Sequence, residues 1–218
     1  MNYDVISNDL VVGSEKKKIY LTIKRIMDVI ISLIGIIVVT PIMLIIILLI
    51  RIDSPGKAIY KHYRLGKNGK VIGIYKFRTM VINADEVFNS FTPEQKAEYE
   101  KFFKLENDPR ITKIGNILRK TSLDELPQLF NILKGDMSII GPRPVVEREI
   151  EKFGNQKDKY LSVLPGLTGW WASHGRSATT YDERIKLEMY YINNLSFKID
   201  LLCFFKTIEV VLKRDGAR

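Results

Sequence analysis

Residues 29–50 read VIISLIGIIVVTPIMLIIILLI, 22 residues without a charged side chain. As one straight α-helix this stretch would be roughly 33 Å long, enough to cross a bilayer. The run is too long and begins too late for a signal peptide, and no small-residue cleavage site follows it. The sequence therefore predicts a membrane segment, and a single transmembrane helix is its simplest form.

Two features of this segment favour a re-entrant hairpin, which enters and leaves the membrane on one side. Pro41 lies near the middle, where a proline removes a backbone hydrogen bond and bends a helix. Both flanks are basic, and a spanning helix cannot keep two basic flanks in the cytoplasm. We therefore favour a helix-break-helix at Thr40-Pro41, with the Thr40 hydroxyl bonding part of the opened backbone. The basic flanking residues are Lys16, Lys17, Lys18, Lys24, Arg25, Arg51, Lys57, Lys61, Arg64, Lys67 and Lys70.

The composition bounds the partners of the chain. A length of 218 residues allows one domain with a proper core in addition to the membrane segment. The net charge of +9 favours anionic partners, and beside a membrane segment these are lipids and phosphorylated substrates rather than DNA. Cys203 is the only cysteine, so an intramolecular disulfide is excluded and a reducing compartment fits.

The rest of the chain has the pattern of a helix-rich α/β domain with one small β element. Residues up to about 19 show little periodicity and are expected to form a mobile tail or an interfacial helix. Strands are expected at 58–63 and 71–80, joined by a turn at 66–69. Residues 195–212 read as an amphipathic helix, which belongs either to the core or to a membrane interface. Further helices are expected at 84–106 with a break near 92–93, and at 112–120, 126–133, 145–153 and 181–193.

Asp124 and Glu125 stand at the start of one of these helices. Ser122 to Glu125 fits a capping box, so these acids have a purely structural explanation. Pro127 has no N–H to donate and fits best in the first turn, which shifts the cap to Asp124. A carboxylate at that position would stay ionised and could share a Mg²⁺ with Glu125 when a diphosphate binds. It would also be a competent nucleophile towards phosphorus.

Arg143 lies between Pro142 and Pro144. The two prolines stiffen the backbone and present one guanidinium, the side chain suited to bidentate phosphate binding. The alternative is a surface arginine in a turn. Lys76, Arg78 and Arg119 could extend a phosphate site, although each taken alone is a typical solvated charge.

Eight segments together resemble the bacterial sugar transferase family, the monotopic phosphoglycosyl transferases. The resemblance covers the chain from about residue 22 to its end. The segments are Lys24-Arg25, Thr40-Pro41, YKFRTM at 75–80, DPRITKIG at 108–115, LDELPQLFN at 123–131, KGDMS at 134–138, GPRP at 141–144 and PGLTGW at 165–170.

The resemblance implies a reaction and a location. A sugar-1-phosphate would pass from a UDP-sugar to undecaprenyl phosphate with release of UMP, initiating the synthesis of a polysaccharide or glycoconjugate. Asp124 would be the nucleophile that carries the phosphosugar covalently, Glu125 would assist the metal or the acceptor, Arg143 would grip phosphate, and Mg²⁺ would be required. The anchor would be re-entrant on the cytoplasmic face of the bacterial inner membrane. The implied division is a tail at 1–21, an anchor at 22–52 and a cytoplasmic catalytic domain at 53–218.

Several points stay open at this level. Many relatives continue differently where this chain has Ala172-Ser173-His174, and that departure could alter the choice of sugar. Larger relatives carry further membrane helices ahead of this module, so a minimal form is expected here. The rival functions are a non-catalytic scaffold that holds polyprenyl phosphate and, from the charge alone, a nucleic-acid binder. The sugar and the oligomeric state, a homodimer included, cannot be read from the sequence.

Overall fold

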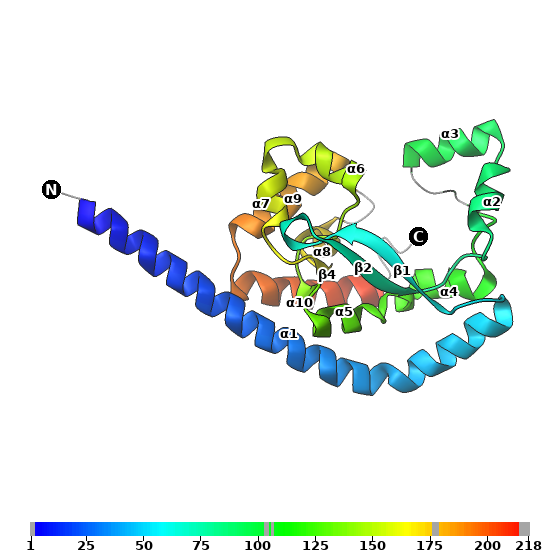
Figure 1. Cartoon of the computed structure of the whole chain (residues 1–218), viewed down its shortest axis with the longest axis horizontal. Helices are drawn as coiled ribbons and strands as arrows, with labels where there is room; N and C mark the ends of the chain where they lie inside the picture. Colours follow the sequence, from blue (N-terminus) through cyan, green and yellow to red (C-terminus); the bar gives the residue numbers. More distant parts are fainter. Residues whose placement is uncertain (1–2, 103–104, 106, 176–178, 214–218) are drawn as a thin grey trace. The chain divides into compact units, whose positions relative to one another are not determined.

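The computed structural model describes residues 3–102, 105, 107–175 and 179–213, and these are mainly helical (Figure 1). The helix-rich prediction with small sheets is confirmed. The α-helices are α1 (Tyr3–Asp53), α2 (Ala84–Asn89), α3 (Pro93–Phe102), α4 (Lys113–Thr121), α5 (Gln128–Lys134), α6 (Glu147–Ile150), α7 (Lys157–Leu161), α8 (Trp170–His174), α9 (Tyr181–Asn193) and α10 (Phe197–Lys213). The strands are β1 (Ile59–Leu65), β2 (Val71–Phe77), β3 (Ser138–Ile140) and β4 (Gly166–Thr168), and the 3₁₀ turns are η1 (Lys67–Gly69), η2 (Leu123–Glu125) and η3 (Glu151–Gln156).

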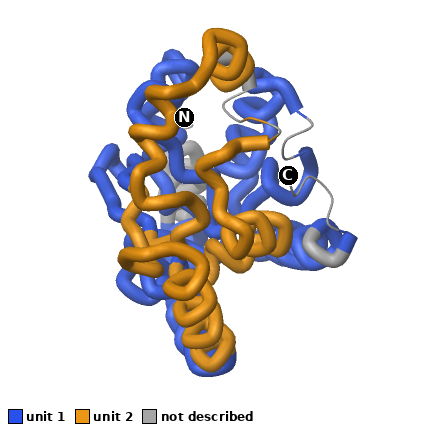
Figure 2. Tube along the Cα trace, turned by 90° about the vertical axis from the view of Figure 1, so that its right-hand side faces the viewer, with its two compact units in different colours: residues 1–38, 63–74, 128–216 blue, residues 39–62, 75–127, 217–218 orange. Residues whose placement is uncertain are grey.

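The chain divides into two compact units (Figure 2). Unit 1 comprises Met1–Val38, Tyr63–Ile74 and Gln128–Gly216. Unit 2 comprises Val39–His62, Tyr75–Pro127 and Ala217–Arg218. The division implied by the resemblance, with boundaries after residues 21 and 52, stays a prediction.

The helix α1 agrees with one expectation and differs from another. It begins at Tyr3, so of the two forms expected before residue 19, a mobile tail or a helix, the structure shows a helix. It also continues through Thr40 with Pro41 inside the helix, so the predicted non-helical break at this step is wrong. A proline removes only one N–H from a helix, and an apolar setting favours keeping the remaining intrahelical bonds. How α1 lies relative to a membrane stays a prediction.

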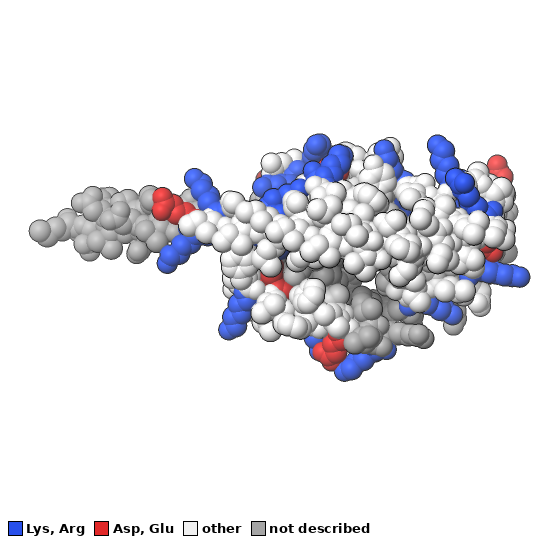
Figure 3. Space-filling model, turned by 90° about the horizontal axis from the view of Figure 1, so that it is seen from below, with Lys and Arg blue, Asp and Glu red and all other residues white. Residues whose placement is uncertain are grey.

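The surface of α1 is strongly apolar. Among the described residues, Glu15–Asp53 forms the only helix long and apolar enough to cross a membrane, and 17% of its most apolar window is buried. In Figure 3 this helix shows an uncharged surface beyond the lysines near its start. Exposed side chains of this kind fit contact with lipid better than contact with water. They include Ile30, Ile34, Ile37, Val38, Leu44, Ile45 and Leu48.

Polar side chains of α1 attach its first part to later elements of unit 1. Lys24 Nζ lies 2.7 Å from Oδ2 of Asp200 in α10, and the Tyr20 hydroxyl donates to the same oxygen at 2.8 Å. The other carboxylate oxygen of Asp200 accepts from the Tyr191 hydroxyl at 2.8 Å. This buried carboxylate therefore joins α1, α9 and α10 through bonds that satisfy both of its oxygens.

Two further side chains of α1 bond to backbone groups. Arg25 donates to the carbonyl oxygens of Ile132 and Leu133, at 2.6 and 2.9 Å. These carbonyls lie in the last turn of α5, and that of Ile132 also accepts the Gly135 N–H at 3.0 Å. Asp28 accepts the N–H of Ile139 in β3 at 2.9 Å. The polar residues at the start of the apolar run thus fix the end of α5 and the edge of β3.

The core of unit 1 surrounds the parallel pair β3–β4. Ser138 pairs with Gly166, and Ile140 pairs with Thr168. A Cβ on Gly166 would lie 2.1 Å from the Gly141 backbone nitrogen, so this close backbone approach requires glycine. α10 packs on both strands, and α8 packs on α9 and α10. The buried residues of this core include Ile140, Val145, Ile150, Phe153, Tyr160, Met189, Tyr191, Ile192, Ile199 and Cys203.

Unit 2 places α4 directly against the segment after β2. The backbone N–H of Thr112 bonds to the Thr79 carbonyl at 3.1 Å, and Met80 forms an isolated bridge with Ile111. The Thr112 hydroxyl then caps α4 by accepting the Gly115 N–H. A Cβ on Gly115 would lie 2.1 Å from the Thr79 carbonyl oxygen. The core of this unit comprises Met43, Ile46, Ile50, Ala58, Phe77 and Leu118.

Most predicted elements are confirmed near their expected positions. The helix predicted at 181–193 is α9, and the helix predicted at 84–106 is interrupted between α2 and α3 as expected. The helix predicted at 145–153 is replaced by α6 and η3, with the chain kinked at Gly154, whose φ is 51°. The strand predicted at 71–80 ends at Phe77, because the chain then leaves β1 and pairs with the segment before α4.

We expect Gly115→Ala to lower the free energy of unfolding by about 2 kcal/mol or more, because a Cβ there forces the Thr79 backbone away. Asn116→Ala is the matched control on the exposed side of α4 and should change stability by less than about 0.5 kcal/mol. Unfolding in detergent, followed by circular dichroism, measures both. Equal stabilities of the two variants would show that this backbone contact is not needed.

Candidate active site

The turn that carries the acidic pair is built by Ser122. This residue has φ 56° and ψ 17°, so α4 ends in a left-handed residue that is uncommon outside glycine. Leu123–Glu125 then forms the 3₁₀ turn η2, and α5 begins only at Gln128. The Ser122 side chain makes no cap hydrogen bond, so the predicted capping box and the predicted capping of α5 by Asp124 are wrong.

Lys76 of β2 bonds to the acidic pair. Its Nζ lies 2.7 Å from Oε1 of Glu125 and 3.7 Å from Oδ2 of Asp124. The side chains of Lys76, Asp124 and Glu125 are 19%, 14% and 29% exposed. An ion pair at this depth is shielded from water only in part, and one ammonium serves two carboxylates.

The environment of Asp124 works against its charge. Burial raises the pKa of the Asp124 carboxyl above its ordinary value, and the neighbouring Glu125 charge adds to this. Lys76 and, more weakly, Arg119 pull the pKa down again. Asp124 is therefore a poorly solvated carboxylate whose charge depends on nearby cations, which favours reactivity over a purely structural role.

Arg119 lies in the last turn of α4 and donates from Nε to the Thr79 hydroxyl at 2.9 Å. Because Thr79 is itself held against the backbone of Gly115, this bond also orients the Arg119 side chain. The structure thus brings four of the predicted site residues together within unit 2. They are Lys76, Arg119, Asp124 and Glu125.

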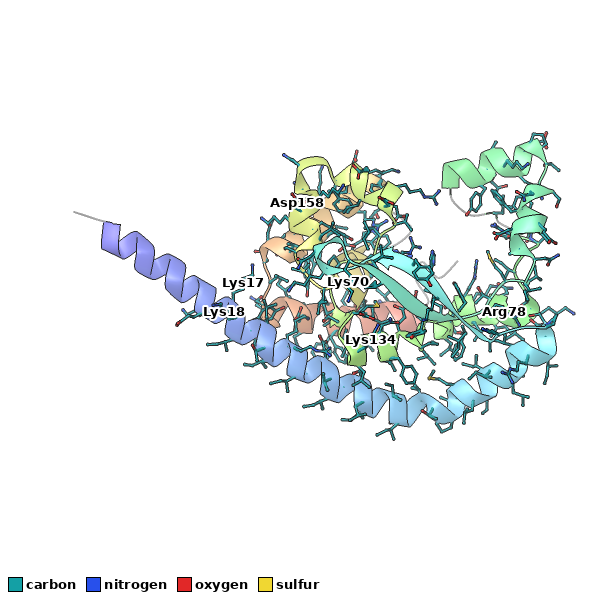
Figure 4. The ribbon with its side chains drawn as sticks, viewed as in Figure 1. Lys17, Lys18, Lys70, Arg78, Lys134 and Asp158 are labelled. Carbon is teal, nitrogen blue, oxygen red and sulfur yellow. The ribbon has the colours of Figure 1, made fainter. Side chains whose placement is uncertain are left out.

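Arg78 has a different neighbourhood from Lys76. Its guanidinium donates to the carbonyl of Ser54 at 2.7 Å, to that of Ile50 at 3.5 Å, and to that of Pro55. Figure 4 shows Arg78 beside the C-terminal end of α1. The Ile50 carbonyl also accepts the Ser54 N–H at 3.1 Å, so Arg78 adds further donors at the end of α1. Alternation predicted one face for Lys76 and Arg78, but β2 ends between them. A phosphate role for Arg78 stays a prediction.

Arg143 belongs to unit 1, where its backbone is held at both polar groups. Its N–H donates to Oε1 of Glu188 at 3.0 Å, and its carbonyl accepts from the Tyr160 hydroxyl. The side chain is exposed, and its guanidinium carbon lies 5.7 Å from the centre of the Trp171 ring. An exposed guanidinium thus lies beside an aromatic ring. A phosphate role for Arg143 stays a prediction.

The sequence reasoning missed Glu188. It is 1% exposed and lies in the segment Leu-Glu-Met-Tyr-Tyr-Ile of α9. The available signal was a single acid within an apolar run on a helix, since such a residue is rarely buried without a partner.

The acidic pair has the chemistry of a magnesium site without forming a complete one. Among the described residues, no group of three or more His, Cys, Asp and Glu side chains gathers in a way that could hold a metal ion. Asp124 and Glu125 offer carboxylate oxygens, and Mg²⁺ is commonly held by one or two carboxylates with phosphate oxygens and water. The residues present therefore fit a metal that arrives with a diphosphate.

Comparisons with known proteins agree with the resemblance seen in the sequence. A family model described as bacterial sugar transferase matches residues 19–214. The chain is 47% identical to an undecaprenyl-phosphate galactose phosphotransferase of Salmonella typhimurium, over 89% of this chain and 41% of that protein. It is 43% identical to a UDP-galactose-lipid carrier transferase of Erwinia amylovora, over 97% of this chain and 44% of that protein. It is also 43% identical to an exopolysaccharide production protein of Sinorhizobium fredii, over 89% and 87%.

The extent of these matches differs. The chain spans less than half the length of the Salmonella and Erwinia proteins, but most of the Sinorhizobium protein. The matched region includes the acidic pair, Lys76, Arg119 and Arg143.

We expect Lys76→Met to raise the pKa of Asp124 further, because the strongest lowering charge is removed. Where a carboxyl has a higher pKa in the folded than in the unfolded state, the protein loses stability as the pH rises through the interval between the two values. The variant should therefore be less stable than the wild type by about 1–2 kcal/mol at neutral pH, and the difference should shrink on acidification. Thermal unfolding in detergent across pH measures this.

Lys70→Met removes an exposed lysine at the start of β2 and is the matched control. It should show no pH-dependent difference from the wild type. A Lys76→Met deficit of the same size at acidic and neutral pH would contradict the assigned charge coupling.

Proposed function

The chain belongs to the bacterial sugar transferase family, and on that premise we propose that it transfers a sugar-1-phosphate from a UDP-sugar to undecaprenyl phosphate. UMP is released, and the product begins the assembly of a bacterial polysaccharide or glycoconjugate. The observation that carries the proposal is the cluster of Asp124, Glu125 and Lys76 in a chain with a long apolar helix. The names of the relatives, which mention undecaprenyl phosphate, UDP-galactose and exopolysaccharide, support the substrate classes.

The proposed reaction has two displacement steps at one phosphorus. A carboxylate oxygen of Asp124 attacks the phosphorus that bears the sugar, and the bond from this phosphorus to the bridging oxygen breaks. The bridging oxygen leaves with the electron pair as part of UMP. A phosphate oxygen of undecaprenyl phosphate then attacks the same phosphorus, the bond to Asp124 breaks, and the carboxylate is regenerated.

The neighbouring side chains have separate roles in this proposal. Lys76 keeps Asp124 charged in its partly buried position until the substrate arrives. Arg119, fixed on Thr79, supplies further positive charge, and Arg143 binds a substrate phosphate. Glu125 holds Mg²⁺ with Asp124, and the bound metal would neutralise charge on the diphosphate.

We also propose that α1 is re-entrant from the cytoplasmic face of the bacterial inner membrane. Basic residues flank both ends of its apolar run, which favours one side for both ends. Pro41 inside the helix permits a bend without a non-helical segment. The helix α10 adds an interfacial surface, since Cys203 and Ile199 are buried while other large apolar residues are exposed. The exposed residues are Phe197, Leu201, Leu202, Phe204, Phe205 and Ile208.

We expect the purified protein with Mg²⁺ to release about one equivalent of UMP from its matching UDP-sugar without any lipid acceptor, because the first step is complete in itself. Asp124→Asn should abolish this burst and reduce turnover by roughly a thousandfold. A panel of UDP-sugars, assayed for UMP, identifies the sugar in the same experiment. Asp158→Asn, an exposed carboxylate in α7, is the control and should behave as the wild type.

Turnover only when undecaprenyl phosphate is present, with no burst, would replace the covalent route by direct transfer. No UMP under either condition would favour a scaffold that only holds the polyprenyl phosphate.

We expect cysteines placed at Lys18 and Lys57 to be reached from the same side of the membrane. Both positions are exposed, and in the sequence Lys18 precedes the apolar run while Lys57 follows it. A membrane-impermeant maleimide is applied to cells so that it reaches only the periplasmic side of an intact inner membrane. Neither cysteine should react until that membrane is opened. Cys203→Ser provides the background, since Cys203 is buried. Labelling of one position alone in intact cells would establish a spanning helix.

A further inference from the structure

The Pro142–Pro144 step contains a single backbone N–H, because proline has none. That N–H belongs to Arg143, and Oε1 of Glu188 accepts it at 3.0 Å. The carbonyl of the same residue accepts from the Tyr160 hydroxyl. Two side chains from α9 and α7 therefore hold the two polar backbone groups of the residue that we propose to bind phosphate.

The Arg143 side chain extends from this fixed backbone to an aromatic surface. Its guanidinium carbon lies 5.7 Å from the centre of the Trp171 ring, and that of Arg184 lies 4.8 Å from the same centre. Trp171 is itself fixed by a 2.8 Å bond from its Nε1 to the Thr179 hydroxyl. Two guanidinium groups near one ring repel each other. Glu149 balances one of them in part, since its Oε1 lies 3.9 Å from Nη1 of Arg184.

Glu188 is a second acid beside these two arginines, and it is buried. It is 1% exposed, and burial raises its pKa to about 7 despite the opposing effects of the Arg143 N–H, Arg184 and Arg143. Its second oxygen has no hydrogen-bond partner among the described residues. A buried carboxylate with an unsatisfied oxygen is costly, and an apolar side chain of similar size would pack at lower cost. Core packing therefore does not explain why an acid stands here.

We infer that Glu188 is a positioning residue for phosphosugar transfer, which fixes the Arg143 backbone so that the guanidinium meets the substrate phosphate in one orientation. This inference rests on the proposed function of Arg143. Glu188 does not touch the substrate, and it acts through its hydrogen bond with the Arg143 N–H. The Tyr160 hydroxyl holds the same backbone from its other polar group, by donating to the Arg143 carbonyl.

The first measurement tests the geometry and does not depend on activity. Arg143 is the only residue of 142–144 with an exchangeable backbone amide, so overlapping peptides in hydrogen exchange report on it directly. Glu188→Leu removes the acceptor and should accelerate exchange of this amide by roughly tenfold or more. Glu188→Gln retains an acceptor oxygen and should leave it protected. Unchanged exchange in Glu188→Leu would overturn the inference.

The second measurement is a double-mutant cycle on steady-state transfer. Arg143→Ala should lower kcat/KM by roughly ten- to a hundredfold, as expected for loss of a charge-assisted phosphate contact. Glu188→Leu should lower kcat/KM by about tenfold in the wild type and have almost no further effect in the Arg143→Ala background. Glu188→Gln should restore activity to within about threefold of the wild type. Asp182→Asn, an exposed acid on α9, is the matched control.

The outcomes separate the inference from the proposed function. Independent, additive effects of Glu188→Leu and Arg143→Ala would show a general structural role and overturn the inference. A normal Glu188→Leu enzyme beside an impaired Arg143→Ala enzyme would overturn it while the phosphate role of Arg143 stands. A fully active Arg143→Ala enzyme would overturn both. If Glu188→Leu does not fold, Tyr160→Phe replaces it in the double-mutant cycle, because it removes the other bond that holds the Arg143 backbone. A smaller loss of kcat/KM is then expected, which again disappears in the Arg143→Ala background.

Discussion

Three polar side chains near the start of an otherwise apolar helix hold the first part of α1 against unit 1. Lys24 bonds to Asp200 of α10, Arg25 to the last carbonyls of α5, and Asp28 to the backbone of β3. Each partner lies in an element far away in the sequence, so these bonds replace the local contacts that α1 lacks. An unbonded polar group would be costly where it is buried against these elements. The same bonds that make α1 compatible with an apolar surface therefore also locate α5, β3 and α10 on it.

The parts of the site that the sequence predicted are those governed by local chemistry. Asp124, Glu125, Lys76 and Arg119 lie together, as the search for a phosphate site required, and the apolar run is a single exposed helix. The predicted capping geometry of the acidic pair was wrong, because Ser122 adopts a left-handed conformation that sequence propensity disfavours. The contact of the α4 backbone with Thr79, permitted by Gly115, belongs to the tertiary structure and has no short-range signal.

Arg78 and Glu188 show two further limits of sequence reasoning. Arg78 lies two residues after Lys76, yet β2 ends between them and the guanidinium satisfies carbonyls at the end of α1. Its charge suggested a phosphate ligand, which stays a prediction, and the contacts that the structure shows are with backbone carbonyls. Glu188 is the opposite case, a functional candidate that the sequence reasoning missed. Several residues of α9 are charged, and the sequence alone does not show that Glu188 is the acid among them that is buried. A charged residue is informative only when the partner of its charge is known, and that partner is set by tertiary structure.

The charges of the acidic pair and of its neighbouring cations balance each other. Asp124 and Glu125 are balanced by Lys76 and Arg119, so the cluster has no excess of positive charge to attract a further anion. In the proposed reaction the nucleoside diphosphate sugar is an anion, and the Asp124 carboxylate would have to approach its phosphorus against that charge. Asp124 and Glu125 would hold the proposed Mg²⁺, which would supply positive charge beside the diphosphate. Lys76 lies 2.7 Å from Glu125, so this ion pair would have to open before the ammonium could bind the diphosphate in full.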